Sequence, residues 1–112
     1  MLLHILRHAE AEALSPSGLD ADRGLTEAGT KRMKAVARAI ARMEPKLDAI
    51  LVSPLLRARQ TAEPVAVACR FKGELQVTES LLPGSSPETL LEELEATRWE
   101  SVLVVGHEPN LG

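Results

Sequence analysis

Aromatic residues are nearly absent from this chain of 112 residues, which has one Phe, one Trp and no Tyr. Proteins that hold single-stranded nucleic acid usually stack its bases on aromatic side chains. The sequence therefore excludes a base-stacking platform, and its hydrophobic core must be built from aliphatic residues.

Cysteine and long hydrophobic runs are also scarce. Cys69 is the only cysteine, so no internal disulfide and no thiolate metal cage can form, which fits a reducing compartment. The apolar start ends at Arg7 after a few residues, far short of a signal sequence or a membrane span of about 20 residues. We therefore expect a cytoplasmic protein with no membrane partner.

An excess of positive charge is missing as well. Thirteen Lys and Arg stand against sixteen Asp and Glu, a formal net charge of −3, so we expect no nucleic-acid partner, and any anion site must be local. A length of 112 residues with 45% hydrophobic content allows one compact core. We expect residues 1–112 to form a single domain.

Apolar runs alternate with segments of helical periodicity along the chain. The strands are expected at residues 2–6, 49–52, 75–78 and 101–105. The helices are expected from the N-cap Thr26 to about Met43, from Ser53-Pro54 to about Ala68 with Pro64 kinking or dividing it, and from Ser86 onward. This order predicts an α/β protein of three α/β/α layers, with a mostly parallel sheet covered on both faces.

Basic side chains follow three of the predicted strands. Arg7-His8 ends the first run, Arg57 comes shortly after the second, and His107 follows the last, with Arg23 and Arg59 as further cations nearby in sequence. Each of them alone would be interpreted as a surface ion pair or a packing residue. Because ligands bind at the carboxyl ends of parallel strands, their coincidence favours a site for a compact dianion such as phosphate.

Three motifs carry a resemblance to a known family. Arg7-His8-Ala9-Glu10, Ser53-Pro54-Leu55-Leu56-Arg57-Ala58-Arg59-Gln60-Thr61 and Gly106-His107-Glu108-Pro109 resemble the histidine phosphatase superfamily, whose fold is phosphoglycerate mutase-like. The short length and the segment Arg23-Gly24-Leu25-Thr26 look most like its SixA-type phosphohistidine phosphatases.

The resemblance implies roles for individual residues. His8 would be the nucleophile that forms a phosphohistidine intermediate. Arg7, Arg57 and His107 would hold the phosphoryl oxygens, with Arg23 as a further phosphate contact, and neither metal nor cofactor is expected. Ser53 and Thr61 are interpreted as helix-start and packing residues.

The general acid is left open between several carboxylates. Glu79 lies where related families keep their acid, and Glu10, Asp20 and Asp22 are alternatives. A phosphohistidine substrate would need little acid help, because its leaving imidazole is readily protonated.

Metal and thiol chemistry are not supported by the sequence. His4 and His8 would lie ~13 Å apart along one strand, too far to share a zinc ion. Cys69 lacks an arginine six positions later, so the loop of cysteine phosphatases is absent.

Three functions remain as hypotheses. The leading one is a metal-independent phosphohistidine phosphatase acting in signal transduction on a phosphorylated protein, such as a histidine-containing phosphotransfer domain, because no long insertion could close over a small substrate. The alternatives are a phosphatase of a small phosphate ester and a catalytically weak phosphate-binding interaction module.

The end of the chain departs from the family pattern. The sequence stops at Gly112, where the family would continue with a helix and at least one more sheet segment. We expect either that the sequence is a fragment or that a second copy covers the gap in a homodimer.

Overall fold

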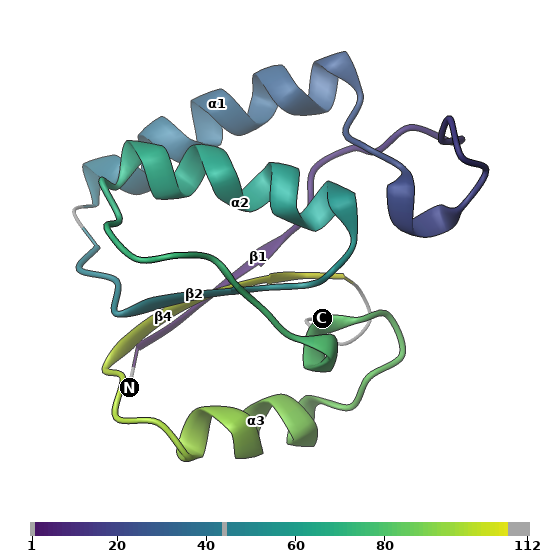
Figure 1. Cartoon of the computed structure of the whole chain (residues 1–112). Coiled ribbons are helices and arrows are strands. Elements are labelled where there is room, and N and C mark those ends of the chain that lie inside the picture. The colour runs from purple at the N-terminus through teal and green to yellow at the C-terminus, as the bar shows by residue number, and fades with distance from the viewer. Residues whose placement is uncertain (1, 44, 108–112) are drawn as a thin grey trace.

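The computed structural model describes residues 2–43 and 45–107 and contains a parallel sheet flanked by helices (Figure 1). The strands are β1 (Leu2–Arg7), β2 (Ala49–Val52), β3 (Gln76–Val77) and β4 (Ser101–Gly106), in the order β1-β4-β2-β3. The α-helices are α1 (Glu27–Arg42), α2 (Leu56–Ala68) and α3 (Pro87–Glu95), and two short 3-10 helices are η1 (Asp20–Asp22) and η2 (Glu79–Leu81). The predicted strand over 75–78 is thus present but short.

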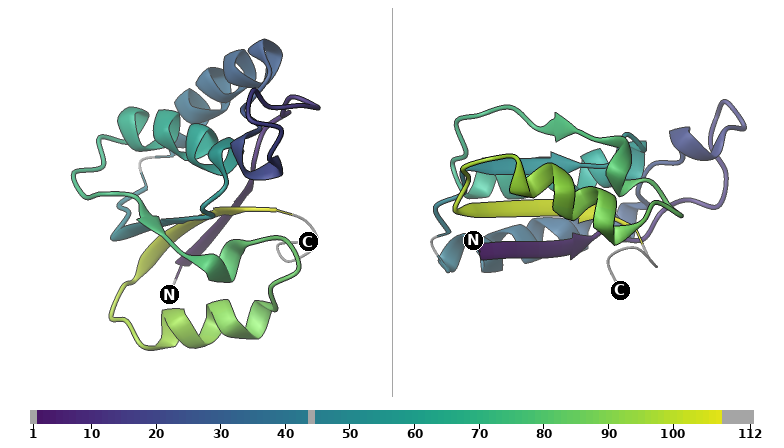
Figure 2. Two further views of the ribbon diagram at one scale, coloured as in Figure 1. Left: turned by 45° about the vertical axis from the view of Figure 1, so that its right-hand side comes forward. Right: turned by 90° about the horizontal axis from the view of Figure 1, so that it is seen from below.

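The layers follow from the alternation of side chains along the central strands. Ile50 and Val52 of β2 pack in a cluster with α1 and α2, whereas Ala49 and Leu51 pack with α3 on the opposite face. Figure 2 shows α1 and α2 on one side of the sheet and α3 on the other. The predicted three-layer α/β/α architecture is confirmed.

The strand order explains why α3 lies on its own face. The chain moves in one direction across the sheet from β1 to β2 and on to β3, then turns back to β4 between β1 and β2. A right-handed crossover in the reverse direction places its helix on the opposite face. β4 is buried along its whole length, in keeping with its continuous apolar sequence.

Two of the three predicted helix starts agree with the structure. The side chain of Thr26 caps α1 by accepting from the backbone N–H of Gly29 at 2.9 Å, and Ser86 caps α3 in the same way. The prediction for α2 is wrong, because the helix begins after Leu55, which supplies no side-chain cap, and Pro54 lies outside it.

Pro64 lies inside α2, as predicted, and does not divide the helix. The helix continues through it to Ala68. Proline removes a single backbone donor, and packing of Ala62 and Val65 in the core holds the turns on either side of it.

The long connection from β1 to α1 folds back over the end of the sheet. Its two ends are joined by hydrogen bonds from Glu12 N to the carbonyl of Gly24 at 2.8 Å and from Thr26 N to the carbonyl of Glu10 at 2.9 Å. A Cβ at Gly29 would overlap the carbonyl oxygen of Glu10, so this close approach requires glycine. The connection thereby holds η1 beside α2.

Some expectations concern residues beyond the described part of the chain. Glu108 and Pro109 of the third motif, and the stretch to Gly112, lie outside it, so the expected departure from the family after His107 stays a prediction. Within residues 2–43 and 45–107, no helix combines the length and the apolar character that crossing a membrane requires.

Candidate active site

The strand ends that carry the predicted site residues meet at one edge of the sheet. Arg7 of β1 lies opposite Gly106 of β4, and His8 N donates to the carbonyl of Gly106 at 3.1 Å. Ser53 N donates to the carbonyl of Val105 at 3.0 Å. The rings of His8 and His107 consequently lie side by side, tilted by 56°, with centroids 4.9 Å apart.

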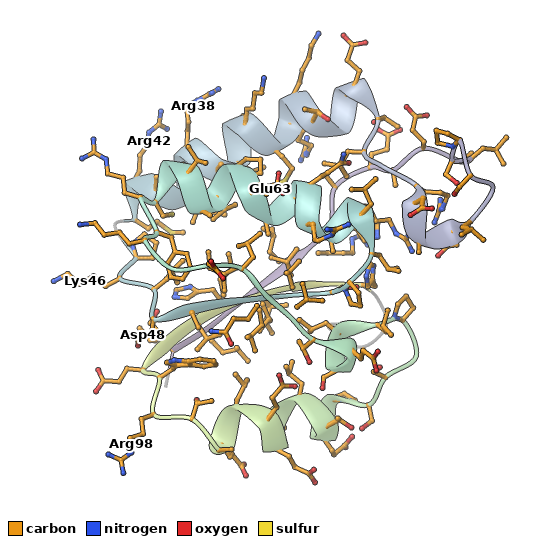
Figure 3. All side chains as sticks on the ribbon, in the orientation of Figure 1. Arg38, Arg42, Lys46, Asp48, Glu63 and Arg98 are labelled. Carbon is orange, nitrogen blue, oxygen red and sulfur yellow. The ribbon has the colours of Figure 1, made fainter. Side chains whose placement is uncertain are left out.

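A pocket of about 770 Å³ opens at this edge. It brings together five of the predicted residues, Arg7, His8, Arg23, Arg57 and His107, and its other lining residues are Leu6, Ala9, Glu10, Arg32, Met33, Val36 and Pro83. The exposed cations further along α1 are not part of it, since Arg38 and Arg42 point away from the protein toward its other end (Figure 3).

His8 is held in one tautomer. Its Nδ1 lies 2.7 Å from the backbone oxygen of Ala9. A carbonyl only accepts hydrogen bonds, so Nδ1 carries the proton and Nε2 carries the lone pair. Burial lowers the pKa of His8, and the charges of Arg57 and Arg7 lower it further against the opposing effect of the Ala9 hydrogen bond. The ring is therefore neutral at neutral pH and its Nε2 can attack an electrophile.

His107 lies deeper than His8 and is 2% exposed. Burial, followed by the charges of His8 and Arg57, lowers its pKa to about 4, which keeps this ring neutral as well. Its Nε2 lies 2.7 Å from Oγ of Ser53. Its Nδ1 is buried and has no hydrogen-bond partner among the described residues.

Arg57 is fixed by the 3-10 helix of the long connection. Its Nη1 donates to the backbone oxygen of Asp20 at 2.9 Å and its Nη2 to the carboxylate of Asp20 at 3.1 Å. Its Nε is buried without a partner in the described part of the chain. Because two nitrogens of its guanidinium group are anchored in this way, Arg57 presents its remaining N–H donors to a ligand without having to reorganise.

Asp20 links two of the cations. Its second carboxylate oxygen accepts from Nε of Arg23 at 2.8 Å, and Arg23 also donates to the backbone oxygen of Glu12. The hydrogen bond from Arg57 is the main reason that the pKa of Asp20 is lowered, with Arg23 adding to it. The anchoring role of Asp20 was not predicted, and only the proximity of Asp20 to Arg23 in sequence hinted at it.

The other carboxylates considered as general acid are placed differently. Glu79 lies on η2, is exposed, and is not among the residues that line the pocket. Glu10 lines the pocket, Asp20 is held ionised by Arg57, and Asp22 accepts from Ser17 at 2.6 Å. The identity of the acid stays a prediction, as do the catalytic roles of His8, Arg7, Arg57, His107 and Glu79.

Of the remaining residues singled out in the sequence, Thr61 packs as predicted. It is fully buried, accepts from the backbone N–H of Ala9 and donates to the carbonyl of Arg57. Arg59 is exposed and does not line the pocket. Across the described ranges, no cluster of three or more His, Cys, Asp or Glu could hold a metal ion.

Comparison with known proteins agrees with this fold. The model of the histidine phosphatase superfamily (branch 1) matches residues 3–82, and the chain belongs to this superfamily. Its SixA-type character appears in the relatives: the chain is 31% identical to phosphohistidine phosphatase SixA of Escherichia coli, over 100% of this chain and 70% of that protein. The family prediction, including the SixA-type branch, is confirmed.

Two further similarities are informative. A structure of the protein histidine phosphatase SixA complexed with tungstate superposes with a TM-score of 0.91 at 30% identity, covering 100% of this chain and 72% of that one. An uncharacterized protein of Picosynechococcus sp. is 40% identical over 100% of this chain and 69% of its own length. The predicted fold and the prediction of a phosphatase are thus confirmed.

Proposed function

We propose that this chain is a metal-independent phosphohistidine phosphatase that removes the phosphoryl group from a histidine of a phosphorylated protein. The observation that carries the proposal is the hydrogen bond from Nδ1 of His8 to the carbonyl of Ala9 at 2.7 Å. It leaves the lone pair of Nε2 in a pocket that Arg7 and Arg57 also line. The name of the relative in Escherichia coli, phosphohistidine phosphatase SixA, supports the choice of substrate.

The reaction takes place in two displacements. Nε2 of His8 attacks phosphorus, the bond from phosphorus to the substrate imidazole breaks, and that imidazole keeps the electron pair and takes up a proton. The hydrogen bond to Ala9 stabilises the positive charge that the His8 ring acquires. Water then attacks phosphorus, the bond to Nε2 breaks, and inorganic phosphate leaves with His8 neutral again.

Positively charged donors support both displacements. Phosphoryl transfer has a loose transition state in which charge spreads over the phosphoryl oxygens. Arg7, Arg57 and Arg23 line the pocket around His8 and offset this charge electrostatically, with His107 as a neutral donor. No step requires a metal ion.

The position of Glu79 favours phosphohistidine over a phosphate ester. An alkoxide leaving group needs a nearby acid, whereas an imidazole has an ordinary pKa near 6.5 and is protonated readily. Glu79 is exposed and does not line the pocket. Glu10 is the candidate acid that lines the pocket, and a substrate whose leaving group needs little acid would not depend on it.

The test compares two substrates. Phosphate release is measured from a histidine-phosphorylated phosphotransfer domain and from an aryl phosphate, with and without a chelator. His8→Ala is the test variant, and His4→Ala is the matched control, because His4 bonds Ser101 at the other end of the sheet. We expect release that prefers the phosphoprotein, resists the chelator, is abolished in His8→Ala and persists in His4→Ala.

Four other outcomes would each contradict a part of this proposal. A preference for the aryl ester would favour the small-molecule phosphatase, and loss of activity with the chelator would contradict metal independence. Release from folded His8→Ala at the unmodified rate would refute the covalent mechanism. No release from a folded protein would favour the phosphate-binding module.

A further inference from the structure

Ser53 and His107 form a buried pair between two neighbouring strands. Ser53 directly follows β2 and is 0% exposed, and His107 directly follows β4 and is 2% exposed. β2 and β4 pair in parallel with Val52 opposite Val105, which brings the two side chains together. Oγ of Ser53 lies 2.7 Å from Nε2 of His107.

The direction of this hydrogen bond follows from the other contacts of the hydroxyl. The backbone N–H of Leu55 donates to Oγ of Ser53 at 3.3 Å and occupies one of its lone pairs. If Nε2 of His107 also donated to Oγ, the hydroxyl proton would be buried without an acceptor among the described residues, which is unfavourable. If the hydroxyl donates to Nε2, its proton is satisfied and the ring proton resides on Nδ1.

We infer that Ser53 is a positioning residue, which donates its hydroxyl proton to Nε2 of His107 and so keeps the proton of that ring on Nδ1 for a phosphoryl oxygen. Nδ1 is the buried atom of His107 that has no partner in the described part of the chain, and His107 lines the pocket. A bare lone pair at this position would repel an anion, whereas Nδ1–H attracts it.

The two histidines then have the same tautomer but offer different ring nitrogens to the phosphoryl group. In His8 the Nδ1 proton is bonded to Ala9 and the Nε2 lone pair is available for attack. In His107 the Nε2 lone pair is bonded to Ser53 and the Nδ1 proton is available for donation. The tautomer rests on the geometry alone, whereas its use in catalysis rests on the proposed function.

Imidazole ¹⁵N and ¹H NMR spectra of the unmodified protein test the tautomer directly. The chain has three histidines, so His4→Ala and His8→Ala variants assign the signals of His107. We expect the proton of His107 on Nδ1 at neutral pH, and we expect inorganic phosphate to shift this proton resonance. A proton on Nε2, or a resonance that phosphate does not move, would overturn the inference.

Ser53→Ala tests the consequence for turnover. We expect kcat/KM for the phosphoprotein to fall about tenfold, which corresponds to about 1.4 kcal/mol, together with a shift of His107 toward the Nε2–H form. Ser101→Ala is the matched control, since Ser101 also bonds a histidine, His4, at 3.3 Å at the start of the same strand. This control is expected to change neither the kinetics nor the spectrum of His107.

The outcomes separate this inference from the proposed function. If Ser53→Ala folds and keeps both full activity and the Nδ1–H form, the positioning role is refuted. If it does not fold, the spectrum of the unmodified protein still decides the tautomer. If the unmodified protein releases no phosphate yet shows His107 as Nδ1–H and responsive to phosphate, the proposed function fails while the pairing of Ser53 with His107 is supported.

Discussion

Substitution of Arg57 isolates the contribution of an anchored guanidinium to phosphoryl transfer. Two of its nitrogens are bonded to Asp20, at 2.9 and 3.1 Å, while its buried Nε has no partner in the part of the chain described. Removal of one preorganised donor to transition-state charge costs about 10²–10³ in kcat. We expect a loss of this size in Arg57→Ala.

Arg57→Lys separates charge from geometry. Lysine keeps the charge and most of the aliphatic stem, but a single ammonium group cannot match a guanidinium that bonds Asp20 and a phosphoryl oxygen with different nitrogens. We expect activity between that of Arg57→Ala and that of the unmodified protein. The side chain of Arg57 is 5% exposed and that of Asp20 is 64% exposed. Lysine keeps the buried charge beside a solvated carboxylate, so Arg57→Lys should lower the Tm by less than ~8 °C, the shift that about 1 kcal/mol produces in a domain of this size.

The assay is phosphate release from the histidine-phosphorylated domain, with thermal denaturation measured on the same samples. Arg59→Ala is the control, because Arg59 lies two residues further along α2 and is exposed outside the pocket. Equal turnover in Arg57→Ala and Arg59→Ala would refute the electrostatic role. A collapse of the Tm in Arg57→Lys would show that the pair with Asp20 is chiefly structural.

Three further results are expected. The NMR titration of His8 should have its midpoint below the ordinary 6.5, because burial and the charge of Arg57 lower its pKa, so the neutral nucleophile persists as the pH falls through 6.5; a midpoint above 6.5 would contradict this. Gly29→Ala should lower the Tm, because overlap of its Cβ with the carbonyl of Glu10 costs about 1–3 kcal/mol and exceeds the gain in helix propensity of about 1 kcal/mol; a raised Tm would be inconsistent with that overlap. Glu10→Gln should slow hydrolysis of an aryl phosphate more than Glu79→Gln does, because Glu10 lines the pocket and Glu79 does not, and the reverse order would support Glu79 as the acid.

Local chemistry made much of the fold predictable. The cap of α1 at Thr26 depends on a side chain and a backbone N–H three residues apart, and such contacts are visible in sequence. The start of α2 was misplaced because Ser53 looks like a cap there, whereas its hydroxyl is bonded to His107, 54 residues away. The tertiary partner decided the role of this serine.

The candidate site was likewise predictable in part, where it depends on strand ends, and not where it depends on the path of a loop. The ends of parallel strands share one edge of the sheet, so His8, Arg57 and His107 could be brought together from sequence. The pair between Arg57 and Asp20 could not, since residues 37 positions apart meet only because the connection from β1 to α1 folds back on itself. Sequence patterns do not determine the path of such a connection.

The combined charge of the pocket suits a phosphoryl dianion. Both histidines have lowered pKa values and are neutral at neutral pH. Within residues 2–43 and 45–107, four arginines line the pocket, namely Arg7, Arg23, Arg32 and Arg57, together with one carboxylate, Glu10. These arginines supply the positive charge that attracts a phosphoryl dianion, so the histidines can exchange and donate protons without having to supply charge. Asp20 contributes by holding Arg57 and Arg23 in place.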